Sequence, residues 1–547
     1  MTKFRNANLR SKLANTAPDT KLVAAIAVPK PNTVNRQGAP AYTLDKWLRL
    51  ISMLNTLKLE NQYYRSETQT MRELKAVVDS CAAENPYLVA QAIVYSRCVG
   101  EGMRSINHLA ATYLAPYCGG FDWAKRFYSL WNKKTKSGGT IFRPDDMSEI
   151  IACFSALNKT KATNSMKKGF ANALETLDAY SILKYKSSLV DIINLVHPDP
   201  KKSKALVEYK GKMVNVLDAV ILGLAVSADT HEVAQSDAGQ EVAKAVREGK
   251  LSKEAAVDVL KEAKAENWTA LLTENKLGTL AALRNIRNIL KTVTDSKTID
   301  LLCSVLSNGT LIRNAKIMPY QIDMAGEILL AEFNTGVDSR KVQQALLAGY
   351  ESALPNLAEM LVGRNLVIID ISGSMNGRRI ADPNPDTSKR TNYVTSCMDK
   401  AALIGATIAK ATLADVIVFG GNAEKRTYNA NADVFSIAQG FKGNLGSTNL
   451  GAAWKLASDA GVNYDRVFIL SDYECNRGNS YEDYTSYVRK CGSPYVYSVD
   501  LGAYGTTQHV GDNVRYYYGF GFAMFDDIAN VEFNPNYHLD KIKQIVI

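Results

Sequence analysis

The stretch Leu366–Ser374 constrains the fold more than any other part of this sequence. Four aliphatic residues, Leu366 to Ile369, lead directly into Asp370. A short, unbroken aliphatic run rich in β-branched side chains is typical of a strand buried on both faces, as in a parallel sheet. Ser372 and Ser374 follow at alternate positions. Open parallel sheets bind ligands at the carboxyl ends of their strands, so the pattern predicts an oxygen-rich site at such an edge.

Two downstream segments offer further oxygen ligands. Thr448 lies in a glycine-flanked loop before an Ala/Leu-rich helix, and Asp472 follows a second aliphatic run, Val467–Leu470. Carboxylates and hydroxyls without Cys or His suit Mg²⁺, Mn²⁺ or Ca²⁺ rather than Zn²⁺. We therefore predict a divalent-cation site, with Mg²⁺ favoured, whose ligands are Asp370, Ser372, Ser374, Thr448 and Asp472. The alternative is that the two serines cap the next helix.

The residues of this site, in this order, resemble the metal-ion-dependent adhesion site (MIDAS) of von Willebrand factor A domains. The resemblance implies a metal with one open coordination position, which a carboxylate of a protein partner completes. The surrounding sequence agrees, because strand-like and helical runs alternate as in a doubly wound sheet. The expected strands are 416–419, 467–470, 495–499 and 514–518, and the expected helices lie near 393–412, 449–460 and 522–531. We interpret the insert Arg378–Arg390 as a linker, with ligand contact as the alternative.

The first two thirds of the chain have a different pattern. From Thr43 to about residue 350, apolar residues recur at helical spacing, and Asn85 followed by Pro86 is a typical helix start. We expect no strand before residue 360. Many short amphipathic helices favour a stack of helical pairs over an ordinary globular helical domain. The expected organisation is an extended arm over 1–40, a helical-repeat domain over 41–360 and an α/β domain over 361–547.

The positive charge lies in the helical part. The net charge is +10, but from residue 363 onward 18 Lys and Arg stand against 19 Asp and Glu, whereas residues 1–362 have 47 against 36. A basic excess confined to one domain points to a polyanionic partner, with a solvated lysine face as the alternative.

Four segments of the helical part, together with the following A domain, resemble Ro 60 kDa autoantigen-like proteins, which contain a TROVE module. Leu57–Tyr64 is similar to their segment after the first helix, and Leu189–Pro198 to their helix ending in His-x-Lys-Pro. Ala281–Ile286 is similar to their Leu-Leu-Arg-Asn-Leu segment, and Ile317–Tyr320 to their Ile-His-Pro-Phe. The resemblance covers roughly residues 40–545 and departs from the family at Leu189-Val190, at Asp199 and over 201–250, which looks like an insertion.

This resemblance implies a ring of HEAT-like repeats closed by the A domain. It also implies a ribonucleoprotein function, in which the ring binds small structured non-coding RNAs and the single-stranded 3′ ends of misfolded RNA. Lysines neutralise phosphates without reading sequence. The candidate RNA-binding lysines, some of which the family places on its outer surface, are Lys133, Lys134, Lys136, Lys161, Lys167, Lys168, Lys184 and Lys186. A metal-dependent protein-interaction module, with the helices as scaffold, is the alternative function.

Enzyme motifs are missing or incomplete. The haloacid phosphatases need a second aspartate at the position of Ser372, and the zinc-protease pattern beginning at His231 lacks its last histidine. A metal-dependent nuclease would need more carboxylates near Asp370. We therefore expect no catalytic residue. The eight scattered cysteines indicate free thiols in a reducing compartment, and with no membrane-spanning run we expect a cytoplasmic monomer.

Overall fold

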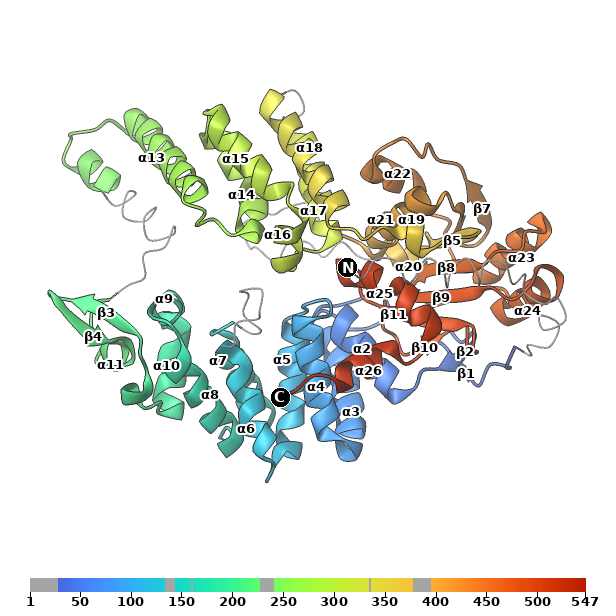
Figure 1. Cartoon of the computed structure of the whole chain (residues 1–547), viewed down its shortest axis with the longest axis horizontal. Coiled ribbons are helices and arrows are strands. Elements are labelled where there is room, and N and C mark those ends of the chain that lie inside the picture. The colour runs from blue at the N-terminus through green and yellow to red at the C-terminus, as the bar shows by residue number, and fades with distance from the viewer. Residues whose placement is uncertain (1–27, 133–142, 159–160, 227–240, 334–335, 377–394) are drawn as a thin grey trace, which may run out of the picture.

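A computed structural model describes residues 28–132, 143–158, 161–226, 241–333, 336–376 and 395–547. An arc of helices begins and ends against an α/β domain, so the described residues have the outline of a ring, in which residues 227–240 of the arc lie outside the described part (Figure 1). The helices of the arc are α2 (Lys46–Thr56), α3 (Glu67–Glu84), α4 (Pro86–Cys98), α5 (Ser105–Leu114), α6 (Asp122–Ser129), α7 (Asp146–Asn158), α8 (Asn164–Thr176), α9 (Ala179–Lys184), α10 (Lys186–Val196), α11 (Val216–Ile221), α13 (Lys253–Thr273), α14 (Thr279–Thr292), α15 (Ser296–Leu306), α16 (Gly309–Asn314), α17 (Pro319–Phe333), α18 (Val337–Ser352) and α19 (Leu357–Met360).

Local sequence explains why these helices begin where they do. Asn85 accepts a hydrogen bond from the backbone N–H of Leu88 at 3.0 Å, and Pro86 is the first residue of α4, as the sequence predicted. Helix α3 begins with a capping box between Ser66 and Gln69. Helices then pack on one another along the arc: α5 contacts α3 and α7, and α15 contacts α14 and α18. The arc is therefore a stack of helical pairs, in which stability comes from neighbour-to-neighbour interfaces.

One expectation about the helical part is wrong. Strands do precede residue 360: besides β1 (Thr33–Val34) and β2 (Pro40–Thr43), an antiparallel hairpin of β3 (Leu206–Tyr209) and β4 (Lys212–Asn215) interrupts the helices. Its two-residue turn, Lys210-Gly211, has φ of 51° and 77°, the left-handed conformation that closes tight hairpins. Both strands are short and largely exposed, so they lack the apolar alternation that reveals a strand in sequence.

The α/β domain is a doubly wound sheet, as predicted. Its strand order is β11-β9-β8-β5-β6-β7, and all neighbours are parallel except the edge strand β7. The elements are β5 (Asn365–Asp370), α20 (Gly373–Asn376), α21 (Cys397–Thr412), β6 (Asp415–Phe419), β7 (Ala423–Arg426), α22 (Val434–Phe441), α23 (Leu450–Ala460), β8 (Arg466–Ser471), α24 (Ser480–Cys491), β9 (Tyr495–Asp500), β10 (Thr506–Thr507), β11 (Val514–Tyr518), α25 (Phe522–Phe533) and α26 (Tyr537–Lys543).

Strand β5 is central and all six of its residues are buried. Its side chains alternate between two cores: Val367 and Ile369 pack with α21 and α22, whereas Leu366 and Ile368 pack with α23 and α24. The first core is continuous with that of the helical arc. This arrangement holds the carboxyl end of β5, and Asp370 with it, in a fixed position.

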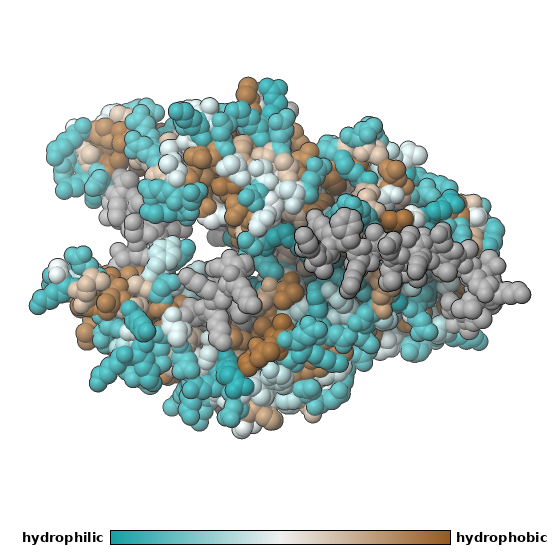
Figure 2. Space-filling model, in the orientation of Figure 1, coloured by the Kyte–Doolittle hydropathy of each residue, from teal (hydrophilic) through white to brown (hydrophobic). Residues whose placement is uncertain are grey.

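Both ends of the described chain connect the two parts. Near the start, β1 (Thr33–Val34) and β2 (Pro40–Thr43) form a small antiparallel sheet with β10, so the extended segment lies on the α/β domain. At the other end, Gln91 donates to the carbonyl oxygens of Lys543 and Ile545, and Arg126 to that of Ile547. Figure 2 shows the molecule hollowed between the α13–α15 and α8–α10 sides of the ring. None of the described helices is long and apolar enough to cross a membrane.

Candidate metal centre and the cavity beside it

Asp370, at the end of β5, is fully buried and held at both carboxylate oxygens. The hydroxyl of Ser471 donates to Oδ2 at 2.6 Å, and the backbone N–H of Ser372 donates to Oδ1 at 2.9 Å. The Oγ atoms of Ser372 and Ser374 lie 3.2 Å apart. Two hydroxyl oxygens at this separation, next to a fixed carboxylate, are placed to face one ion.

The other two predicted ligands come from neighbouring loops. Asp472 follows β8, is 3% exposed and accepts a hydrogen bond from Ser374. Thr448 is 1% exposed, and its loop packs against the β5 end, where the N–H of Gly373 donates to the carbonyl of Gly446 at 2.8 Å. The structure therefore places four of the predicted residues in one hydrogen-bonded group, with Thr448 in the adjoining loop.

The electrostatics of this group suit a cation. Burial raises the pKa of Asp370 to about 7, and the nearby charge of Asp472 contributes to the rise. Burial likewise raises the pKa of Asp472. Within the described part of the chain, no lysine, arginine or histidine forms an ion pair with either carboxylate. Two buried, mutually repelling carboxylates with hydroxyls beside them fit a hard divalent cation, which would offset both charges.

Sequence reasoning missed two further carboxylates at this sheet edge. Burial raises the pKa of Glu474 to about 8, and its Oε1 is buried without a hydrogen-bond partner among the described residues. Asp500 ends β9, and burial raises its pKa to about 6, while the N–H groups of Gly502 and Ala503 donate to its Oδ1. The strand-end rule that identified Asp370 would also have identified Asp500, because Asp500 follows the predicted strand 495–499.

The sheet edge that carries Asp370, Ser374 and Asp472 is called the metal edge below. It faces a cavity of about 350 Å³ between the two parts of the molecule. The hydroxyl of Tyr64 hydrogen-bonds Ser374, and the Tyr64 ring packs edge-on against Tyr504, with centroids 5.7 Å apart. The cavity is lined by Thr56 at the end of α2, by Lys58, Glu60, Asn61, Gln62 and Tyr63 after that helix, by Tyr320, Gln321 and Met324 of α17, and by Ser374, Asn376, Thr395, Ser396, Cys397, Lys400, Asp472, Leu501, Gly502 and Tyr504 of the α/β domain. The segment that carries the Ro-like resemblance, Leu57–Tyr64, therefore lies at the metal edge.

The predicted RNA-binding lysines are not equivalent. Lys133, Lys134 and Lys136 lie outside the described residues. Lys186 donates to the backbone carbonyls of Leu224 and Val226, at 3.0 and 3.4 Å, and so has a structural role. The lysines that remain are Lys161 before α8, Lys167 and Lys168 on α8, and Lys184 at the end of α9; all are exposed except the half-buried Lys167.

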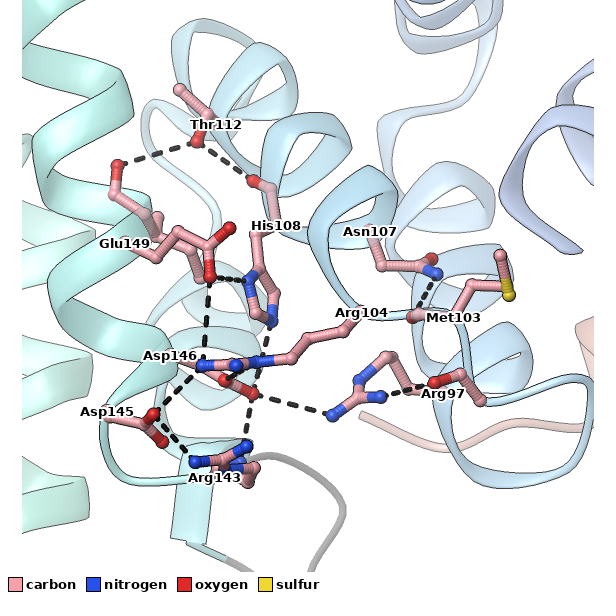
Figure 3. A network of polar contacts seen from close by, with 12 residues as sticks. Arg97, Met103, Arg104, Asn107, His108, Thr112, Arg143, Asp145, Asp146 and Glu149 are labelled. Atoms are coloured by element: carbon pink, nitrogen blue, oxygen red, sulfur yellow. Dashed lines mark hydrogen bonds and ion pairs between the residues drawn. The ribbon is translucent and has the colours of Figure 1, made fainter. Parts of the chain in front are cut away.

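A second group with metal-ligand chemistry joins α5 and α7 (Figure 3). His108 lies 2.9 Å from Glu149 and 3.1 Å from Asp146. Arg97 and Arg104 also contact Asp146, so positive side chains already neutralise the carboxylates. Burial alone would lower the pKa of His108, but its hydrogen bonds to the two carboxylates raise the pKa overall. We therefore interpret this group as a buried ion network that connects two repeats.

Comparison with known proteins identifies the fold. No protein-family model and no curated protein sequence matches the chain. Among solved structures, the Ro (RSR) protein of Deinococcus radiodurans aligns with a TM-score of 0.51 and 15% sequence identity, over 89% of this chain and 100% of that one. The Ro-like architecture predicted from the sequence is thereby confirmed: the chain has the fold of the Deinococcus Ro protein along that protein's whole length.

Proposed function

We propose that this chain is an RNA-binding protein of the Ro type, which binds small structured RNAs and single-stranded 3′ ends. The observation that carries the proposal is the ring itself, a helical-repeat arc closed by an α/β domain and hollowed in the middle (Figures 1 and 2). The likeness to the Ro protein extends over the entire length of that protein. No catalytic role is part of the proposal.

The charge distribution supports an RNA partner. Residues 1–362, which include the whole helical arc, carry 47 Lys and Arg against 36 Asp and Glu. Exposed lysines on and beside α8 and α9 provide phosphate contacts of the kind that give affinity without sequence specificity. The candidates within the described chain are Lys161, Lys167, Lys168 and Lys184, and Lys133, Lys134 and Lys136 remain candidates from the sequence.

We also propose that the α/β domain is of the von Willebrand factor A type and binds one divalent cation, with Mg²⁺ favoured. The cation would be held by Asp370, Ser372, Ser374, Thr448 and Asp472, and when bound it would supply an open coordination position for an oxygen ligand. Support comes from the burial of both carboxylates and from the hydroxyls aligned beside them.

Binding of a hairpin RNA with a single-stranded 3′ tail tests the function. Fluorescence anisotropy would be measured at about 50 and about 200 mM salt, with Mg²⁺ and with EDTA. We expect binding that requires the tail and weakens steeply at the higher salt concentration, because several phosphates are neutralised. An absence of binding at low salt would overturn the RNA-binding proposal and favour the alternative, a protein-interaction module whose metal site is the functional part.

A further inference from the structure

The cavity beside the metal edge has aromatic walls from both parts of the molecule. Tyr63 is 56% exposed, although it is a large aromatic residue. Tyr320 belongs to α17 and Tyr504 to the loop after β9, and both line the same cavity. Aromatic rings that border a polar cavity are the groups on which nucleic-acid bases stack. A cavity that binds only the carboxylate of a protein partner would not need aromatic rings.

Two lysines of this cavity have no carboxylate partner. The ammonium of Lys400 lies 3.9 Å from the ring centroid of Phe520 and 5.4 Å from that of Tyr320, and Lys58 lies 5.6 Å from the Tyr320 centroid. Neither lysine forms an ion pair within the described chain, although Glu60 and Asp472 also line the cavity. Burial lowers the pKa of Lys400, and the more distant charges of Glu60 and Asp399 offset only part of that shift. An anionic ligand would supply a direct ion-pair partner.

The remaining lining matches the other parts of a nucleotide. Side-chain amides of Asn61, Gln62 and Gln321 offer both donors and acceptors, as a base edge requires. Ser374 and Asp472 present the predicted cation at the same cavity, and phosphate oxygens are hard ligands that suit Mg²⁺. A volume of about 350 Å³ is at the lower end for ligand pockets and suits one nucleotide rather than a folded RNA element.

We propose that this cavity binds the terminal nucleotide of a single-stranded RNA end. Its phosphate contacts Lys400, Lys58 and the cation, and its base stacks against Tyr63 or Tyr320, which are less buried than Tyr504. The proposal rests on the proposed RNA-binding function and deepens it. It assigns the metal edge to the RNA itself rather than to the carboxylate of a protein partner.

The test compares two forms of the same tailed hairpin RNA, one with a free 3′ end and one whose 3′ end carries a bulky dye. Both are titrated in Mg²⁺ against the full chain and against Lys400→Gln, Lys58→Gln and Tyr63→Ala. The matched controls are Lys425→Gln, an exposed lysine on the edge strand β7, and Phe533→Ala, an aromatic residue that is 75% exposed on α25. Circular dichroism verifies that each variant is folded. Lys58 and Tyr63 are exposed, so at least those two variants are expected to fold.

We expect the free 3′ end to bind about tenfold more tightly than the blocked end in the parent chain, and the three cavity variants to lose this preference. The two controls should keep it. If the parent chain binds both RNAs equally well, the cavity proposal is overturned while RNA binding by the ring stands.

A calorimetric titration with uridine monophosphate separates failure of the cavity from failure of the ring. If no RNA binds, Mg²⁺-dependent binding of the nucleotide that Lys400→Gln abolishes still supports the cavity proposal. An absence of nucleotide binding, with Mg²⁺-dependent binding of a glutamate-containing peptide, would instead identify a carboxylate as the ligand and overturn it.

Discussion

The guanidinium of Arg65 donates to the backbone carbonyl of Ala503, with Nη1 3.0 Å from the oxygen. Its other terminal nitrogen donates to the carbonyl of Gly502 at 3.1 Å, and Nη1 also pairs with Glu73. Arg65 is 2% exposed and precedes α3, whereas Gly502 and Ala503 follow β9. One buried side chain therefore fastens the start of the helical arc to the loop beside the metal edge.

Replacing this arginine should weaken the whole molecule. We expect Arg65→Ala to lower the free energy of unfolding by about 3 kcal/mol, because two buried carbonyls lose their donor and Glu73 loses one of its three arginine partners. Urea denaturation followed by circular dichroism measures the change. Arg340→Ala, at an exposed position on α18, is the control and should unfold at nearly the parent urea concentration. Equal midpoints for the two variants would contradict the structural role of Arg65.

The packing of α18 against α15 depends on a glycine. A Cβ at position 349 would lie 2.0 Å from the carbonyl oxygen of Leu306, a backbone atom that has little room to move. We expect Gly349→Ala to destabilise the protein by about 2 kcal/mol. Gly326 in the middle of α17 is the matched control, since a Cβ there meets no atom within 4 Å. Gly326→Ala should leave the melting temperature unchanged or raise it, and a fall like that of Gly349→Ala would show the packing argument to be wrong.

The His108 network predicts a pH dependence of stability. The folded pKa of His108 is raised above its ordinary value of about 6.5. Its stabilising contribution is therefore complete below about pH 6.5 and is lost as the pH rises through the folded pKa. Hydrogen bonds and charge interactions with His108 and Arg97 overcome burial and lower the pKa of Asp146, so the contribution of Asp146 is lost only in strong acid. We expect His108→Gln to cost more stability at about pH 6 than at about pH 8.5.

Urea unfolding of the parent and His108→Gln at both pH values checks this prediction. The quantity of interest is the difference between the two proteins, because other titrating groups affect both alike. A difference that is the same at pH 6 and pH 8.5 would mean that the protonation of His108 does not stabilise the network.

The metal proposal predicts a mutation whose effect changes sign with Mg²⁺. With EDTA, Asp472→Asn should raise the melting temperature, because it removes one of two repelling buried carboxylates. With Mg²⁺, the parent should gain stability by ligand binding to the native state and the variant should not. Asp459→Asn, at an exposed position on α23, serves as the control. Scanning calorimetry in the two buffers would refute the proposal if Mg²⁺ stabilised the parent and Asp472→Asn equally.

Sequence patterns predicted those parts of the fold in which residues adjacent in the sequence determine the secondary structure. The aliphatic run before Asp370 became the fully buried strand β5, and the strands beginning near residues 416, 467, 495 and 514 followed the same rule. Strand β7 (Ala423–Arg426) escaped detection because it is a polar edge strand, and α24 (Ser480–Cys491) because tyrosines and charged residues dominate it. In both, the tertiary environment decides the structure rather than an apolar pattern.

In the candidate site too, some residues were predictable from the local sequence, whereas other contacts depend on the tertiary fold. Asp370 and Asp472 were identifiable because Asp370 ends one buried strand and Asp472 follows another. The contact between Tyr64 and Ser374 was not, since it depends on how the arc closes on the α/β domain. In sequence, Lys186 resembles the lysines near it. Only the fold shows that its ammonium donates hydrogen bonds to backbone carbonyls after α11.

The way the ring closes limits the topology of what can pass through it. The helical arc meets the α/β domain at both ends, where α26 lies on α4 and α21 lies on α17. One covalently continuous chain thus encircles the opening, and only non-covalent contacts, such as those of Gln91 and Arg126, complete the circle. If RNA binds in the opening as proposed, a linear RNA would enter by its end. A covalently closed circular RNA cannot become linked with the ring unless those contacts separate.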